Sequence, residues 1–273
     1  MTAPRQNILM CAPDYYDVNY VINPWMQDNC GRIDTKLARQ QWDNLRTLLS
    51  AHADIALVPP QPGWPDMVFT ANAGIVLGKQ VVVSHFLARE RQGEEPFFHD
   101  WFKKDGFEIL PWPEDMSFEG AGDALWDRGQ PLLWIGSGFR SAATAPSLLQ
   151  SVFGRPVAHL QLVDPRFYHL DTCLCPLEGG YLMYFPAAFD DAGLLEIESR
   201  IPAEKRIIVP EQDALEFACN TVDINKHVFM NMASVDLQSR LKAAGFTPTV
   251  TPLSEFMKAG GAAKCLTLKL VEL

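Results

Sequence analysis

The 273-residue sequence lacks the features that mark several large classes of protein. No apolar run approaches membrane-spanning length, and the stretch from Met1 to Asp14 lacks the long apolar core of a signal peptide. The six cysteines are too few for a disulfide scaffold in a chain of this size, and no CxxC pair occurs. We therefore expect a reduced, cytoplasmic protein with no membrane partner.

Positive charge is also scarce. The chain has 23 Lys and Arg against 33 Asp and Glu, which gives a formal net charge of -10. The basic residues are scattered, and this balance argues against nucleic acid as a partner, whereas it suits a small cationic substrate. There is neither a GxGxxG motif nor a P-loop, and residues 118–123 are too irregular for a dinucleotide fingerprint.

The sequence does contain a repeated order of elements. An amphipathic segment followed by a short apolar strand recurs about five times, and hairpin turns follow at intervals of roughly 50 residues. The helix and strand pairs are 35–52 with 55–58, 96–105 with 107–111, 146–153 with 157–163, 192–201 with 206–210, and 235–244 with 246–250. The last hairpin has to be shared between residues 265–270 and strand 8–10, which closes a ring. We therefore predict one α/β domain over residues 1–273.

Residues 167–185 combine polar and apolar positions in an unusual way. With the strand period of two, His169, Asp171 and Cys173 share one face of a predicted hairpin that is otherwise apolar. Burying a histidine with a carboxylate is costly unless both are satisfied, so the pair indicates either a structural hydrogen bond or chemistry. A zinc site that adds Cys175 would span about 20 Å along a straight strand, which is too far for one metal ion. We therefore predict no metal.

Cys265 lies in a glycine-rich loop, residues 259–268, that opens the terminal strand. Glycines allow the backbone to approach a ligand, and loop amides could lower the thiol pKa from about 8.5 toward neutrality. The alternative is a free buried cysteine at the start of a strand. A nucleophilic cysteine needs an acid or base, and His169, with Asp171 two residues further on, is the best placed histidine in the pattern.

Polar side chains recur in the loops that the repeat places around the ring. Loops on a rigid scaffold are where chemistry usually resides, although Asx and Glu residues are also ordinary in turns. In chain order these residues are Asp66 and Asn72, Glu119 and Asp123, His169 and Asp171, Glu216 and Asn220, and Cys265.

With these loops in view, the chain resembles the pentein superfamily of guanidine-modifying enzymes. This superfamily includes arginine deiminases, dimethylarginine dimethylaminohydrolases, amidinotransferases and arginine dihydrolases. The resemblance covers nearly the whole chain, and its motifs occur in the order that the family has. It implies a five-bladed ββαβ propeller, which agrees with the repeat.

The resemblance implies four roles close to the reacting group. The family's C-terminal nucleophile in a Gly-Gly loop corresponds to Cys265. Its strand-end His-x-Asp supplies the general acid/base and a carboxylate that holds the guanidinium, which correspond to His169 and Asp171. The carboxylate that pairs with the histidine corresponds to Glu119.

Further residues are implied to bind substrate. Asp123 looks like a substrate-binding acid, although its loop carries one extra residue. Arg140, in residues 136–141, looks like the family's carboxylate-binding arginine, and Arg91 is a second candidate, with Arg89 as the alternative assignment next to it. For Arg140 and Arg91 the alternative is an ordinary surface arginine.

One departure from the family's motifs favours one of the family's reactions over the others. Residues 69–72 read Phe-Thr-Ala-Asn where deiminases and dimethylarginine hydrolases have Phe-x-x-Asp, and Asp66 stands six residues before Asn72. Together with residues 11–17 and 20–26, this asparagine looks like the cyanobacterial-type arginine dihydrolases. A carboxylate clamps a guanidinium but repels a neutral ureido oxygen, whereas an asparagine both accepts from N–H groups and donates to that oxygen.

We therefore expect hydrolysis of L-arginine to ornithine, carbon dioxide and two ammonia through a covalent cysteine intermediate, without cofactor or metal. Asn23 is expected to belong to a lid that excludes water from the site. One alternative is a single hydrolysis to citrulline, from arginine or from dimethylarginine. Another is a non-catalytic sensor that binds arginine. The chain is also a candidate for homo-oligomer formation.

Overall fold

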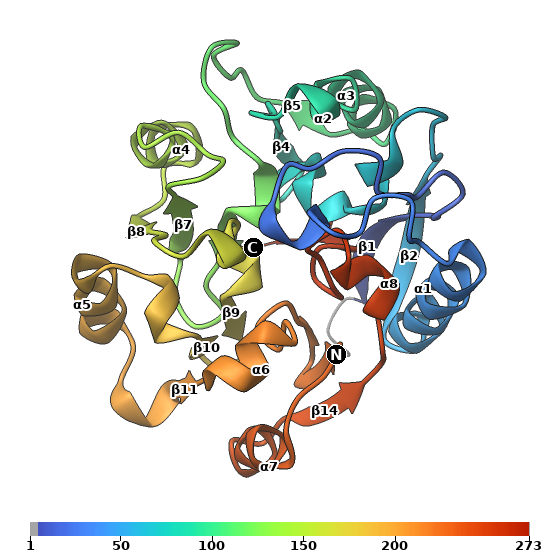
Figure 1. The fold of residues 1–273 in the computed structure, drawn as a ribbon. Coiled ribbons are helices and arrows are strands. Elements are labelled where there is room, and N and C mark those ends of the chain that lie inside the picture. The colour runs from blue at the N-terminus through green and yellow to red at the C-terminus, as the bar shows by residue number, and fades with distance from the viewer. Residues whose placement is uncertain (1–4, 273) are drawn as a thin grey trace.

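Five three-stranded sheets surround one central axis in the computed structural model, which describes residues 5–272 (Figure 1). In each sheet the inner and middle strands are antiparallel, and the middle and outer strands run parallel. A helix connects the middle strand to the outer strand, because parallel neighbours require a crossover connection. Each sheet and its helix thus form one ββαβ blade.

The blades follow one another along the chain, and the first is completed by the last strand. The first consists of β15 (Leu268–Lys269), β1 (Gln6–Cys11), α1 (Thr35–Ser50) and β2 (Ala53–Val58). The second has β3 (Gly74–Leu77), β4 (Gln80–Val83), α3 (Glu95–Lys104) and β5 (Glu108–Ile109); the third has β6 (Ala124–Trp126), β7 (Leu133–Ser137), α4 (Ala145–Phe153) and β8 (Val157–Gln161). The fourth has β9 (Leu174–Leu177), β10 (Tyr181–Tyr184), α5 (Asp191–Arg200) and β11 (Arg206–Ile208); the fifth has β12 (Val222–Ile224), β13 (His227–Met230), α7 (Val235–Ala243) and β14 (Thr247–Val250).

Short helices occur in the connections within and between blades. Three of them are α-helical: α2 (Arg89–Gln92), α6 (Glu211–Leu215) and α8 (Ser254–Met257). The 3-10 helices are η1 (Pro24–Met26), η2 (Pro65–Val68), η3 (Thr70–Ala73), η4 (Gly120–Gly122), η5 (Pro165–Phe167), η6 (Leu170–Thr172), η7 (Pro186–Ala188) and η8 (Ala203–Lys205). The prediction of five repeated units and of a terminal strand shared with strand 8–10 is therefore confirmed.

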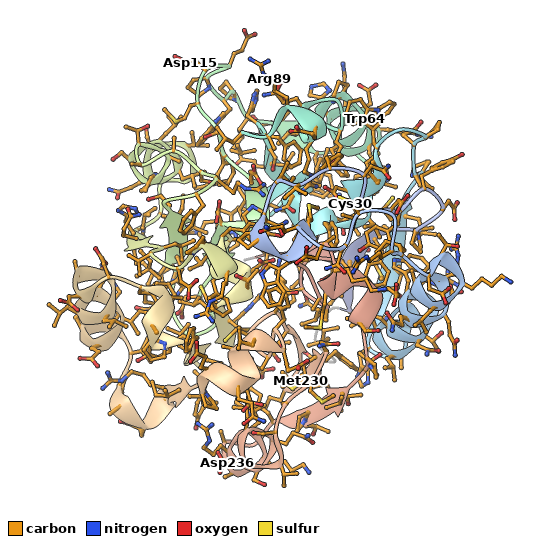
Figure 2. All side chains as sticks on the ribbon, in the orientation of Figure 1. Cys30, Trp64, Arg89, Asp115, Met230 and Asp236 are labelled. Carbon is orange, nitrogen blue, oxygen red and sulfur yellow. The ribbon has the colours of Figure 1, made fainter. Side chains whose placement is uncertain are left out.

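The helix α1 shows how the sequence specifies these elements. The Asp34 side chain accepts hydrogen bonds from the backbone N–H groups of Lys36 and Leu37, which caps the helix N-terminus. Residues at helical spacing form its buried face, namely Ala38, Gln41, Trp42, Leu45 and Leu49. Buried apolar side chains from all five blades form the core, and Figure 2 shows the side chains on the ribbon.

The prediction that His169, Asp171 and Cys173 share one face of a strand is wrong. Residues 170–172 form the 3-10 helix η6, and the strand β9 starts only at Leu174. One local and one long-range hydrogen bond hold this turn: the Thr172 hydroxyl donates to the His169 carbonyl, and the Leu170 N–H donates to the carboxylate of Asp123, in another blade. His169 and Asp171 therefore stand before the strand rather than on it.

The segment between β1 and α1 crosses one end of the ring (Figure 1). It is tied to several blades: Trp25 Nε1 donates to the Arg166 carbonyl, and Asn23 Nδ2 donates to the Ala259 carbonyl. The Ile22 carbonyl accepts from Arg140. These contacts place residues 20–26 over the end of the axis where the loops that precede the inner strands meet.

Candidate active site

Each inner strand is preceded by a loop that delivers polar side chains to the same end of the axis. The helices η3, η4 and η6 stand directly before β3, β6 and β9, respectively. Residues 216–221 precede β12, and residues 259–267 precede β15. Because the blades are related by rotation about the axis, these five loops meet at one place.

A pocket of about 280 Å³ lies where the loops meet. Seven of the predicted site residues line it, which are Asn23, Asp66, Asn72, Arg91, Arg140, His169 and Cys265. Ile22, Met26, Phe69, Tyr168, Ala259 and Gly261 complete the lining. Glu119 and Asp171 stand behind this lining, in contact with His169 and Cys265, respectively. Arg89, the alternative to Arg91, is exposed to solvent and does not reach the pocket.

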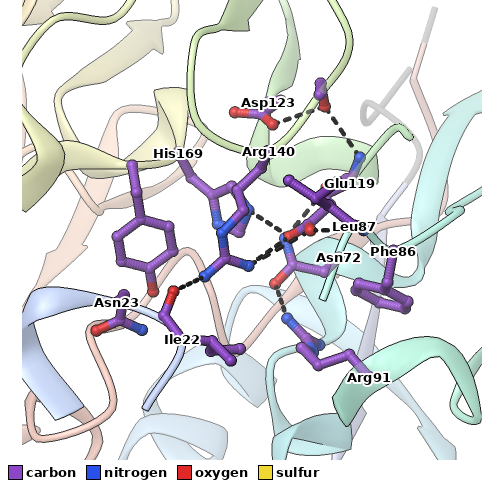
Figure 3. A network of polar contacts seen from close by, with 12 residues as sticks. Ile22, Asn23, Asn72, Phe86, Leu87, Arg91, Glu119, Asp123, Arg140 and His169 are labelled. Atoms are coloured by element: carbon purple, nitrogen blue, oxygen red, sulfur yellow. Dashed lines mark hydrogen bonds and ion pairs between the residues drawn. The ribbon is translucent and has the colours of Figure 1, made fainter. Parts of the chain in front are cut away.

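His169, Glu119 and Arg140 form one buried network, drawn in Figure 3. His169 Nε2 lies 2.7 Å from a carboxylate oxygen of Glu119, and Arg140 Nη1 lies 3.0 Å from the same oxygen. The Arg140 guanidinium also stacks on the Tyr168 ring at 4.7 Å. Burial alone would raise the pKa of Glu119, but Arg140 and His169 outweigh it and hold the pKa well below its usual range.

Cys265 lies beside a second buried carboxylate. Its Sγ atom is 3.4 and 3.6 Å from the two oxygens of Asp171, and 3.0 Å from Asn220 Nδ2. Burial, and then the charge of Asp171, raise the pKa of the Cys265 thiol well above its usual value. The expectation that loop amides bring this pKa toward neutrality is wrong, because the Ala262 N–H lowers the pKa but burial outweighs it. Burial likewise raises the pKa of Asp171 to about 6.

Asn72 is held in one orientation by both ends of its amide. Its Oδ1 atom accepts from Arg91 Nη1 at 2.9 Å, and its Nδ2 atom donates to the Glu119 carbonyl at 3.1 Å (Figure 3). A Cβ atom on Gly122 would come within 2.3 Å of Nδ2, so only glycine leaves room for this amide. Arg91 is itself fixed by a buried two-pronged ion pair with Glu94.

Asp123 does not line the pocket. One of its carboxylate oxygens accepts from the Ser141 hydroxyl at 2.6 Å, and the other accepts from the Leu170 N–H at 3.1 Å. The contact with Leu170 holds the residue that follows His169. The structure therefore gives Asp123 a positioning contact, in place of the contact with substrate that the resemblance implies.

The remaining polar groups at the pocket have distinct environments. Asp66 accepts from the Tyr20 hydroxyl through Oδ2, whereas its buried Oδ1 has no hydrogen-bond partner among the described residues. Burial raises the pKa of Asp66. The Asn23 side chain caps η1 by accepting from the N–H groups of Trp25 and Met26.

A model of the family described as N,N-dimethylarginine dimethylhydrolase, eukaryotic, matches residues 18–272. The chain belongs to this family. Proteins with different described activities are similar in sequence to this chain. The bifunctional arginine dihydrolase/ornithine cyclodeaminase ArgZ of Synechocystis is 54% identical over 97% of this chain, which spans 38% of that protein. A dimethylarginine dimethylaminohydrolase of Mycobacterium tuberculosis is 38% identical over 98% of this chain and 87% of its own length.

Crystal structures of the N-terminal domain of ArgZ are similar to this member of the dimethylarginine dimethylhydrolase family over nearly their whole length. They are 54% identical, with a TM-score of 0.97 over 98% of both chains. One is a cysteine-to-serine mutant bound to its substrate, and another is an asparagine-to-serine variant bound covalently to a reaction intermediate. The predicted five-bladed fold is thus confirmed.

Two residues of the site were not assigned a role from the sequence. Asn220 appears there only as one polar residue in a repeated loop, and nothing local distinguishes it from a turn asparagine. Lys264, which lowers the pKa of Asp171, directly precedes Cys265. Its position beside the predicted nucleophile is the one signal that could have singled it out.

A second cavity, of about 570 Å³, lies along the axis between the inner strands and holds none of the predicted site residues. It is lined by the partly buried Arg128–Glu272 ion pair and by Lys269. Across residues 5–272 no three His, Cys, Asp or Glu side chains are arranged to hold a metal ion. No described helix combines the length and apolar character needed to cross a membrane.

Proposed function

We propose that residues 1–273 form a single catalytic domain that hydrolyses L-arginine to ornithine, carbon dioxide and two ammonia molecules. The similarity to the ArgZ N-terminal domain over 98% of both chains supports an arginine dihydrolase. The chain spans 38% of the bifunctional relatives, so the cyclodeaminase activity named for them is not part of the proposal. The cysteine and the asparagine that were replaced in the ArgZ structures carry numbers one lower than Cys265 and Asn72.

The observation that carries the proposal is the environment of Asn72. Its amide uses one N–H on the Glu119 carbonyl and one oxygen lone pair on Arg91, and an amide has one more of each. The second N–H can donate to the carbonyl oxygen of a ureido group, which a carboxylate at this position would repel. The pocket can therefore retain a ureido intermediate for a second reaction.

The two ends of an arginine molecule find complementary groups in the pocket. Asp171 beside Cys265 supplies the negative charge for the guanidinium. Among the described residues, Arg140 Nε has no acceptor and Oδ1 of Asp66 has no donor, although both residues line the pocket. Arg140, together with Arg91, binds the α-carboxylate, and Asp66 binds the α-ammonium group. Asn23 holds the segment that closes over them.

The first round of the reaction converts the guanidinium to a ureido group. When the substrate cation offsets the charge of Asp171, the thiol passes its proton to His169 and the thiolate adds to the guanidinium carbon. His169, oriented by Glu119, then donates this proton to the departing nitrogen, and ammonia leaves. A water molecule loses a proton to His169 and adds to the same carbon. The C–S bond then breaks as the new hydroxyl group passes its proton to the sulfur, which gives the thiol and citrulline, and His169 releases its proton to solvent before the second round.

The second round acts on the ureido group without its release. Cys265 adds to the ureido carbon, His169 protonates the second leaving nitrogen, and a thiocarbamate remains on the sulfur. Water hydrolyses this thiocarbamate to a carbamate, which loses carbon dioxide and leaves ornithine. Two water molecules are consumed for two ammonia molecules released.

A second candidate function is a single hydrolysis of dimethylarginine to citrulline and dimethylamine. The description of the family model and the M. tuberculosis relative favour it. It needs the same Cys265, His169 and Glu119, but it needs no group that retains a ureido product. The identity of the products therefore separates the two functions.

The test is a product count. The purified protein is incubated with L-arginine, and ornithine, citrulline and ammonia are quantified, with dimethylarginine as a parallel substrate. We expect one ornithine and two ammonia per arginine from the wild-type protein, and citrulline as the main product of N72D, because the carboxylate repels the ureido oxygen. Citrulline and one ammonia from the wild type would overturn the dihydrolase proposal.

Two cysteine variants control this test. C265S removes the proposed nucleophile and is expected to abolish turnover of both substrates. C30S replaces an exposed cysteine (Figure 2) and is expected to leave the products unchanged. Cytoplasmic location and homo-oligomer formation stay predictions, which cell fractionation and size-exclusion chromatography can test.

A further inference from the structure

Asn220 is fully buried beside the nucleophile, in the loop between α6 and β12. The loop turns sharply at Phe217, whose backbone φ of 55° is rare for a bulky residue, and the Asn220 N–H donates to the Phe217 carbonyl. The Phe217 ring packs on Trp25 with a centroid distance of 4.6 Å. The segment that covers the pocket and the turn that presents Asn220 thus support each other.

The side-chain amide of Asn220 makes four hydrogen bonds. Its Oδ1 atom accepts from the backbone N–H groups of Ala262 and Cys265, each at 3.0 Å. Its Nδ2 atom donates to the Asp171 carbonyl and to Cys265 Sγ, each at 3.0 Å. Both N–H groups and both oxygen lone pairs of the amide are therefore used.

These contacts fix the direction in which the amide points. Two backbone N–H groups can be satisfied only by the oxygen, so the NH₂ group has to face the sulfur and the Asp171 carbonyl. A hydrogen bond to a charged acceptor is about twice as strong as one to a neutral acceptor. The N–H of Asn220 therefore stabilises a thiolate at Cys265 more than it stabilises the neutral thiol.

We propose that Asn220 is a catalytic residue, which donates a hydrogen bond to the Cys265 thiolate and holds the nucleophile at a fixed place beside Asp171. The amide joins three blades at this point, since Asp171 precedes β9, Asn220 precedes β12 and Cys265 precedes β15. Its N–H acts against the two influences that favour the neutral thiol, which are burial and the charge of Asp171. The role deepens the proposed function, because it concerns the same nucleophile.

A second buried asparagine offers a matched control. Asn231 accepts from the Leu253 N–H at 2.7 Å, and it donates to the Glu216 carbonyl at 3.0 Å and to the Met257 sulfur at 2.8 Å. It links backbone segments and a sulfur atom as Asn220 does, but the sulfur is a thioether that cannot ionise. Replacing Asn231 therefore reports what a buried amide contributes to folding alone.

The test measures the reactivity of Cys265 directly. The full-length variants N220A, N220D and N231A are alkylated with iodoacetamide over a range of pH, and the modification of Cys265 is followed by mass spectrometry of its peptide. N220A removes all four hydrogen bonds. N220D keeps oxygen acceptors for the two backbone N–H groups and replaces the donor by a carboxylate. Thermal unfolding of each variant is measured in parallel.

We expect N220A and N220D to shift the alkylation profile to higher pH and to slow alkylation near neutral pH by about tenfold or more, as befits loss of a hydrogen bond to a charged group. Turnover of arginine should lose kcat by a similar factor, with little change in KM. N231A should lower the unfolding temperature and leave the alkylation profile where the wild type has it.

Unchanged alkylation profiles in both Asn220 variants, with a loss of unfolding temperature like that of N231A, would overturn the proposal and leave Asn220 a purely structural residue. Alkylation requires no turnover. A shifted profile in a protein that does not hydrolyse arginine would therefore refute the proposed function and leave the role of Asn220 intact.

Discussion

Two buried carboxylates flank the pocket, yet their pKa values are shifted in opposite directions. Glu119, on the histidine side with His169 and Arg140, is held ionised because Arg140 and His169 outweigh the effect of burial. Asp171, on the thiol side with Asn220 and Cys265, has a pKa raised to about 6, because burial exceeds the opposing effect of Lys264. The two sides differ in whether a cation is in direct contact with the carboxylate.

The difference indicates on which side of the pocket the positive charge of the substrate changes the ionisation of protein groups. The histidine side is charged and paired before substrate arrives, so His169 is oriented from the start. On the thiol side an ionised Asp171 faces a thiol that burial keeps neutral, and a guanidinium cation would relieve both. Under the proposed function, the substrate cation therefore promotes ionisation of the thiol.

The largest effect is expected when the histidine side loses its carboxylate. E119Q leaves the buried Arg140 without a counter-charge, so we expect the free energy of unfolding to fall by about 3–5 kcal/mol. His169 also loses its partner, and kcat/KM for arginine should fall about a hundredfold or more. Urea denaturation and steady-state kinetics measure the two losses.

Glu114 is exposed and provides the matching control. E114Q should retain the stability and activity of the wild type. An E119Q protein that is as stable as E114Q would contradict the view that Arg140 depends on Glu119.

The corresponding change on the thiol side should separate activity from stability. D171N leaves no protein cation unpaired at short range, and an ionised carboxylate is disfavoured at this site. We expect kcat/KM for arginine to fall about a hundredfold or more, because the guanidinium loses its counter-charge. The free energy of unfolding at pH 7 should stay the same or rise, in contrast to E119Q. Loss of stability in D171N similar to that in E119Q would erase the distinction between the two sides.

The pKa of Asp171 also predicts a pH dependence. Below about pH 6 the carboxyl of the free enzyme is protonated and cannot attract the guanidinium, so kcat/KM should decrease as the pH falls through this value. Stability changes in the other direction: a folded pKa above the unfolded value near 3.8 favours folding at low pH, and this contribution is lost as the pH rises through about 6.

A pH profile of kcat/KM for the wild type and for D171N checks this assignment. The residual kcat/KM of D171N should lack the acid limb of the profile, which is the decrease as the pH falls through about 6. Persistence of that limb in D171N would assign it to another group, such as Asp123, whose pKa burial also raises to about 6.

The smallest effect is expected from the lysine next to the nucleophile. The Lys264 ammonium donates to the Ala121 carbonyl and lowers the pKa of Asp171. K264M should therefore move the acid limb of kcat/KM to higher pH by about one unit or less. The exposed Lys242 serves as control, because K242M should leave the limb in place. A limb that moves to lower pH in K264M would contradict the role of this charge.

The sequence predicted the blades better than it predicted the details of the site. Five helices and the strands after them follow from periodicity, because each blade buries one helix face and one sheet within itself. The turn at Leu170–Thr172 could not be predicted in this way, since it depends on a hydrogen bond from Leu170 to Asp123 in another blade. The contacts of Asn220 likewise join segments far apart in the chain. Local patterns carry no information on such contacts.

The position of β1 in its sheet has a consequence for the order in which the site is assembled during synthesis. This strand pairs with β2, which follows it closely in the chain, and with β15, which comes after the strands of all the other blades. Glu119 and His169 precede Cys265 in the chain, so their loops are synthesised before the loop that carries the thiol. The proposed nucleophile thus joins the other loops only in the step that closes the ring, so a chain that stops before Cys265 lacks it.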